Sequence, residues 1–179
     1  VWGKLYRRSL IQKSGARFVD LAEIGSYEDG FFNLEVFGKA NRVVYLAAYL
    51  YHYRRDGSSS VTSGYNPRLY DQWQTLYNRM EAIIQSNQLG SEYEAALNNR
   101  IALGILGLGL NITVSTQSMG KKVKDIHRII RQERYRKAYK NLPLNYFPIH
   151  WKLFYGCARH GFAFGVYVLL TVIQRIISR

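Results

Sequence analysis

The sequence predicts a mostly helical α/β chain whose short strands are confined to its first third. Two runs rich in β-branched and aromatic residues, 42–46 and 50–54, are typical of strands. From Tyr65 onward, apolar residues instead recur at helical spacing, in successive segments that end at Gly or Pro. We therefore expect a small α/β part followed by a helical extension.

Composition and charge limit the classes of protein. The 179 residues, 47% of them hydrophobic, are enough for a folded core. One cysteine, Cys157, excludes an internal disulfide and fits a reducing compartment.

Residues 121–179 hold 13 Lys and Arg against 2 acids, so they carry +11 of the net +13. Such asymmetry points to nucleic acid or an anionic membrane surface. The chain starts at Val1 without a basic and apolar leader, and we expect it to be part of a longer protein.

The chain opens with a predicted strand end that leads into a short helix. Leu5, Leu10 and Ile11 can share one face of this segment, which covers residues 1–13. Gly15 should end the helix, because glycine readily adopts the left-handed conformation of a C-cap.

A second helix is predicted after an extended piece at 17–19 and a loop through Gly25. Ser26 and Asp29 have the spacing of a capping box, in which the side chain at each of the two positions accepts a hydrogen bond from the backbone N–H of the other. The apolar residues that follow predict about three helical turns, ending near Gly38.

Two longer helices are predicted next. Asn66 and Pro67 suit the start of a helix that runs to about Gln88. Residues 91–94 form a second capping-box pattern and open a helix apolar enough to be buried. Its three glycines lack the preceding strand of a dinucleotide-binding fingerprint, so they predict close helix packing. They are Gly104, Gly107 and Gly109.

The last third is predicted to be basic and then apolar. Residues 121–140 form a basic amphipathic helix, with Val123, Ile126 and Ile130 on one side. Further along, the uncharged run 161–173 has 13 residues, fewer than the ~18–20 that span a bilayer. This segment suits a helix that lies in the membrane interface, although a tilted or re-entrant insertion stays open.

Glu28 and Asp29 are the first candidate for chemistry. Acids are favourable in the first turn of any helix, because they face the positive end of its dipole, so capping alone explains the pair. The same position also suits a general base, which must be ionised to accept a proton from a hydroxyl.

A basic, hydroxyl-rich segment is the second candidate. Arginines bind phosphate oxygens with charge-assisted hydrogen bonds, and hydroxyls add neutral ones. A flexible loop of this composition can close over a diphosphate, but on composition alone a solvated surface turn is the better explanation. Its residues are His52, Arg54, Arg55, Ser58 and Ser60.

These pieces follow one another in an order that resembles a known family. They read GKLYRRSLI from Gly3, RF from Arg17, EDGFFNL from Glu28, VVYL from Val43, LYHYR from Leu50 and SSSVT from Ser58. The succession covers about residues 1–64 and resembles the second half of the catalytic domain of bacterial family 2 glycosyltransferases. These enzymes build capsular polysaccharide, exopolysaccharide and lipopolysaccharide.

The resemblance implies a GT-A (Rossmann-like) fold, a nucleotide-sugar donor and inversion at the anomeric carbon. Asp29 would then take the proton of the acceptor hydroxyl, and Glu28 would orient the acceptor or the helix. Arg54 and Arg55, with Ser58 and Ser60, would lie over the diphosphate. His52 would contact the phosphates or the metal.

The same resemblance implies a Mg²⁺ or Mn²⁺ ion in the complete enzyme. The Asp-x-Asp motif that holds it in the family does not occur in these residues. We therefore expect that this chain alone holds no metal ion and transfers no sugar.

The expected organisation has three parts. Residues 1–64 would be the acceptor-side half of the catalytic domain, 65–118 a helical extension, and 119–179 a membrane-docking segment. The expected partners are a nucleotide-sugar, a glycan or lipid-linked acceptor and the anionic surface of a membrane. The protein would be cytoplasmic and would bind peripherally to the inner face of the cell membrane. No nucleic-acid partner is expected. The alternative is a non-catalytic basic module that binds an anionic membrane or nucleic acid.

Overall fold

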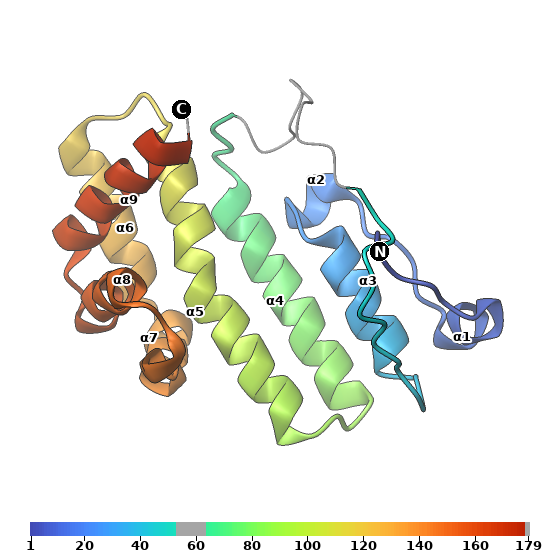
Figure 1. Ribbon diagram of the computed structural model, residues 1–179. Helices are drawn as coiled ribbons and strands as arrows, with labels where there is room; N and C mark the ends of the chain where they lie inside the picture. Colours follow the sequence, from blue (N-terminus) through green and yellow to red (C-terminus); the bar gives the residue numbers. More distant parts are fainter. Residues whose placement is uncertain (53–63, 178–179) are drawn as a thin grey trace. The chain divides into compact units, whose positions relative to one another are not determined.

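A computed structural model describes residues 1–52 and 64–177, which are helical wherever they have regular structure. They belong to two compact units. The first consists of Val1–Ser63 and Arg68–Gly90, and the second of Gly64–Pro67 and Ser91–Arg179. The helices of the first unit are α1 (Arg8–Ser14), α2 (Leu21–Ile24), α3 (Glu28–Phe37) and α4 (Leu69–Ser86), coloured blue to green in Figure 1.

One apolar cluster of the first unit lies between α1 and α3. Ala16, Phe32 and Val36 are buried there. Phe18 stacks on Phe32 with ring centroids 4.6 Å apart and planes 5° from parallel. This packing fixes α3 against the chain that precedes it, because aromatic pairs add specific geometry to burial.

The predicted end of α1 is confirmed, and its predicted apolar face is partly wrong. Gly15 adopts φ 68°, the left-handed conformation of a C-cap. Leu10 and Ile11 pack against the core. Leu5, in contrast, lies before the helix and is fully exposed.

The predicted capping box at the start of α3 is wrong. The hydroxyl of Ser26 accepts a hydrogen bond from the indole N–H of Trp73 at 3.1 Å. The N-cap is Tyr27, with φ 74° and no capping side chain. The loop expected before it contains α2, capped by Asp20, whose carboxylate accepts from the N–H of Ala22. The predicted end near Gly38 is confirmed.

Residues 42–46 do not form the predicted strand, and the described residues contain no strand at all. Val43 is 67% exposed and Tyr45 is 90% exposed. A strand needs a hydrogen-bonded neighbour, and the described residues supply none. The second predicted strand ends at residues 53–54, outside the described residues. The α/β class and GT-A fold of the whole domain stay predictions.

α4 is shorter than predicted at both ends. Its N-cap is Arg68, not Asn66. The backbone N–H of Asn66 donates to the side-chain oxygen of Asn111 at 2.7 Å, and the amide of Asn111 donates to the carbonyl of Asn66 at 2.8 Å. The backbone of Asn66 is thus tied to α5 of its own unit, and α4 begins at Leu69.

The second unit is a bundle of helices, coloured yellow-green to red in Figure 1. The bundle is built around α5, which packs against α6, α7 and α9. The elements are α5 (Ser91–Thr113), α6 (Met119–Arg131), α7 (Glu133–Asn141), the short η1 (Leu144–Tyr146), α8 (Ile149–His160) and α9 (Ala163–Ile177).

The single basic helix predicted over 121–140 is two helices. Gln132 leaves the helical region, with ψ 141°, and separates α6 from α7. The break lets both helices bury apolar residues: Ile126 and Ile130 on α6, and Tyr135 and Tyr139 on α7. Core packing therefore overrides a helical period that would otherwise run on.

The prediction of close helix packing at the glycines of α5 is confirmed at Gly109. A Cβ added there would lie 2.4 Å from Cδ1 of Leu170, on α9. Gly109 and Leu170 are both buried. α9 can approach α5 this closely only because the residue at 109 has no side chain.

One helix in the described part of the chain, α5, is long and apolar enough to cross a membrane, and 44% of its most apolar window is buried inside the structure. α9 is apolar but shorter. The two compact units also differ from the three parts predicted from the sequence, since α4 groups with the first. The functional division at residues 64 and 118 stays a prediction.

Candidate active site

Asp29 lies in the first turn of α3, and its side chain is 37% exposed. Oδ1 accepts a hydrogen bond from the N–H of Gly30 at 2.6 Å. Oδ2 lies 3.6 Å from the nitrogen of Val1. One carboxylate oxygen is therefore held by the backbone, while the group as a whole stays reachable from solvent. Glu28 precedes it in the same turn and is half-buried.

Two residues that sequence reasoning did not single out accompany this carboxylate. Asn33 follows Asp29 by four positions, which places both on one face of α3. The hydroxyl of Tyr6 donates to Oδ1 of Asn33. Burial raises the pKa of Tyr6, and the charge of Asp29 raises it further, so the phenol lies within electrostatic reach of Asp29 and keeps its proton.

A sequence signal for both residues was present. Tyr6 belongs to the GKLYRRSLI run, and Asn33 belongs to EDGFFNL. The spacing of four from Asp29 to Asn33 marks a shared helix face, but nothing in a sequence pairs a tyrosine 27 positions away with that face. Together Tyr6, Asp29 and Asn33 form the candidate active site.

The backbone at the entry to α3 is strained. Tyr27 has φ 74°, which is uncommon for a residue other than glycine. Its ring occupies the space that a side chain at Gly30 would need, because a Cβ there would lie 2.2 Å from Cε1 of Tyr27. Strained residues of this kind gather at functional sites, and this one directly precedes the two acids.

The predicted phosphate-binding residues are only partly within the structure. His52 is exposed. Its neighbour Tyr51 stacks on Trp2, with ring centroids 5.5 Å apart, and Nζ of Lys4 lies 5.8 Å from the ring of Trp2. The segment before His52 thus returns to the start of the chain. Arg54, Arg55, Ser58 and Ser60 lie outside the described residues.

The described residues do not form a metal site of their own. No three His, Cys, Asp or Glu side chains among residues 1–52 and 64–177 come together to hold an ion. What the candidate active site offers chemically is an accessible carboxylate beside a hydroxyl donor and a side-chain amide. Such a group can accept a proton from a bound hydroxyl.

Comparisons with known proteins bear on the class of reaction. EpsH of Bacillus subtilis (strain 168), provisionally named a glycosyltransferase, is 35% identical over 102 residues, which are 57% of this chain and 29% of EpsH. EpsJ of the same organism, named an uncharacterized glycosyltransferase, is 31% identical over 157 residues, which are 87% of this chain and 44% of EpsJ.

No protein-family model matches the chain, and no solved structure matches it. The chain spans less than half the length of the two curated relatives, 29% of one and 44% of the other. It is therefore similar to part of two proteins that are named as glycosyltransferases.

Proposed function

We propose that the chain is the acceptor-side part of an inverting family 2 glycosyltransferase of the capsular or exopolysaccharide type. The full-length enzyme moves a sugar from a nucleotide-sugar donor to a glycan or lipid-linked acceptor. The observation that carries the proposal is Asp29, an accessible carboxylate in the first turn of α3 with one oxygen fixed by the N–H of Gly30. The similarity to two glycosyltransferases supports the reaction class.

In this proposal Asp29 acts as the general base. The acceptor hydroxyl gives its proton to a carboxylate oxygen while the hydroxyl oxygen bonds to the anomeric carbon. The bond from that carbon to the diphosphate oxygen breaks on the opposite face, and the nucleoside diphosphate leaves with the electron pair. A base held within hydrogen-bond reach of the hydroxyl contributes typically 10²–10⁴-fold to such a step.

Tyr6 and Asn33 are positioning residues in this proposal. The hydrogen bond between them fixes the side of α3 that Asp29 shares. Burial keeps Tyr6 protonated, so it donates. A rigid wall beside the base holds an acceptor in a reactive geometry, which lowers the entropy cost of reaching the transition state. Glu28 would orient the acceptor or the helix.

The donor diphosphate is proposed to bind at His52 and at the arginines and serines that follow it. Those that follow are Arg54, Arg55, Ser58 and Ser60. A divalent ion, Mg²⁺ or Mn²⁺, would offset charge on the leaving diphosphate. The described residues do not gather three ligands for it.

Residues 42–46 are proposed to complete a sheet in the full-length enzyme. They carry a run of β-branched and aromatic residues and are exposed throughout. An exposed run of this composition can pair with another strand. Pairing would fix the position of His52, which follows six residues later.

The stereochemistry of the product tests the reaction type. The full-length enzyme is incubated with nucleotide-sugars and a glycan acceptor, and the anomeric configuration of the product is read by NMR coupling constants. Inversion relative to the donor is expected, and retention would contradict the proposal. The 179-residue chain alone is expected to transfer no sugar.

The alternative function is a non-catalytic basic module that binds an anionic membrane or nucleic acid. It is favoured by the net charge of +11 over residues 121–179. Nucleic-acid binding with a steep salt dependence, together with no loss of function in Asp29→Asn, would support it.

A further inference from the structure

The solvent side of α9 is as apolar as its buried side. Ala163, Val166 and Leu170 are buried in the bundle. Phe164, Val168, Val172 and Ile176 are exposed and recur every four residues, which places them together on the opposite face. We call these four residues the α9 stripe. A helix of a soluble domain normally presents polar residues on that side, so the stripe calls for a partner.

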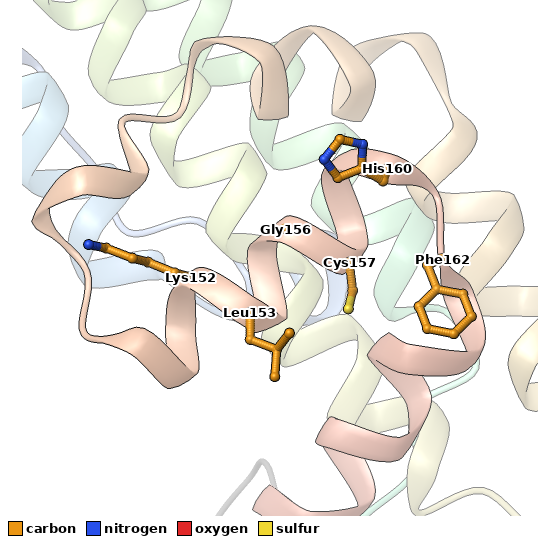
Figure 2. Close-up of a pocket in the computed structure, with 6 residues that line it drawn as sticks. All are labelled: Lys152, Leu153, Gly156, Cys157, His160 and Phe162. Atoms are coloured by element: carbon orange, nitrogen blue, oxygen red, sulfur yellow. The ribbon is translucent and has the colours of Figure 1, made fainter.

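Exposed apolar residues also lie on α8, which packs against α9. Ile149 and Leu153 are exposed one turn apart. Next to Leu153 a shallow hollow of about 330 Å³ is lined by Gly156, Cys157 and Phe162. Figure 2 shows Leu153 and Phe162 on either side of Cys157, with His160 also lining the hollow.

The charged residues of α8 and α9 have one sign. Residues 134–179 contain no Asp or Glu. Lys152 borders the hollow, and Arg175 is exposed on α9 beside the stripe. Arg131 of α6 reaches the turn between α8 and α9, where a Cβ added to Gly161 would lie 2.8 Å from its Nε. An exposed apolar surface whose charged residues on α8 and α9 are all basic fits a partner that is apolar inside and anionic at its edge.

We propose that the exposed face of α8 and α9 docks on the interface of a bilayer that contains anionic lipids. The α9 stripe and Leu153 enter the boundary between headgroups and acyl chains. Lys152, Arg175 and Arg131 contact lipid phosphates. This is the arrangement of amphipathic helices that lie in the membrane plane, where each cation near an anionic leaflet adds to binding.

Charge favours a bilayer over a second copy of the chain. Two copies that met through this face would bring like charges together, because the segment 121–179 carries +11. Nucleic acid fits less well, since the uncharged run 161–173 offers no cation to a phosphate backbone. The proposal does not depend on Asp29, which belongs to the other unit.

Vesicle co-sedimentation of the full-length protein tests the proposal. The protein is mixed with vesicles of equal parts phosphatidylglycerol and phosphatidylcholine, or of phosphatidylcholine alone. Binding is expected only with phosphatidylglycerol, and it should weaken as salt rises. Arg175→Gln should weaken binding about fivefold, as expected for one cation near an anionic surface.

A matched pair of valines tests the apolar part. Val168 in the stripe is 42% exposed, and Val114, after α5, is 40% exposed. Val168→Ser should weaken partitioning about tenfold, because two methyl groups no longer leave water. Val168→Ser with Val172→Ser should weaken it about a hundredfold, whereas Val114→Ser should change it little. Circular dichroism checks that each variant is folded.

Three results would overturn the proposal. The first is equal partitioning of Val168→Ser and Val114→Ser. The second is binding that is indifferent to phosphatidylglycerol. The third combines two observations: the wild type does not bind vesicles, and analytical ultracentrifugation shows a dimer that Val168→Ser dissociates. That result would assign the stripe to contact with a second copy of the chain. A transferase that binds no vesicles would leave the proposed reaction intact.

Discussion

Gly109 offers the sharpest test of how the second unit is packed. In Gly109→Ala the added Cβ would lie 2.4 Å from Cδ1 of Leu170, and Leu170 is itself fully buried. Leu170 cannot swing into solvent, so α9 or the leucine must shift. Overpacking of this kind costs about 1–3 kcal/mol of unfolding free energy.

The helix propensity of alanine opposes that cost. A glycine inside a helix is about 1 kcal/mol less favourable than alanine, so Gly109→Ala should lower the unfolding free energy by about 0–2 kcal/mol. Gly156→Ala in α8 is the matched control, because nothing lies within 4 Å of its added Cβ. It should stabilise by about 1 kcal/mol.

Subtracting the unfolding free energy of one variant from that of the other cancels the helix propensity of alanine. The remainder is the cost of the contact between residue 109 and Leu170. We expect Gly109→Ala to be less stable than Gly156→Ala by about 1–3 kcal/mol, measured by urea unfolding with circular dichroism. Equal stability of the two variants would refute the close approach of α5 and α9. It would also remove the physical reason given for glycine at this position.

Two further predictions concern the first unit. Tyr6→Phe removes the hydroxyl that donates to Asn33. In the full-length enzyme, kcat should fall about fivefold while the KM for the donor stays unchanged, as for a hydrogen bond worth about 1 kcal/mol. An unchanged kcat would contradict the positioning role of Tyr6. Burial raises the pKa of Glu35 above its ordinary 4.5, although the N–H of Arg17 and the charge of Arg79 lower it. The folded state therefore binds this proton more tightly than the unfolded state, and the stability it contributes is full below pH 4.5 and lost as pH rises through the folded pKa. Glu35→Gln should abolish that loss in urea titrations between about pH 4 and 7, and parallel wild-type and variant curves would count against it.

The helices of the second unit were largely predictable from sequence. Their apolar residues recur at helical spacing, and burial of those residues is what holds the helices in place. The break at Gln132 was not predictable, because it depends on where α6 and α7 each meet the bundle. A periodic pattern does not record which neighbour it packs against.

The start of α3 shows the limit of local reasoning. Serine is a favoured N-cap residue, but the hydroxyl of Ser26 accepts a hydrogen bond from the indole N–H of Trp73, 47 positions further along the chain. Tyr27 is then left at φ 74° as the N-cap. The acids Glu28 and Asp29 were correctly placed in the first turn, because their position follows from the apolar run after them.

The strands predicted at 42–46 and 50–54 show a different limit. β-branched runs predict strands only when a neighbour completes the ladder. The described residues hold no such neighbour, and Val43 and Tyr45 remain exposed. Likewise the contact of Tyr6 with Asn33 needed the fold, since it joins two motifs that the sequence shows only in succession.

The most direct test of the central claim is Asp29→Asn in the full-length enzyme. The amide keeps the size of the carboxylate and still accepts from the N–H of Gly30, but it does not accept the acceptor's proton. Asp20→Asn is the control, because it makes the same change at the cap of α2. We predict that Asp29→Asn lowers kcat by about 10²–10⁴-fold while nucleotide-sugar binding by calorimetry stays within about twofold and Asp20→Asn remains active. A kcat for Asp29→Asn equal to that of the wild type would contradict Asp29 as the general base.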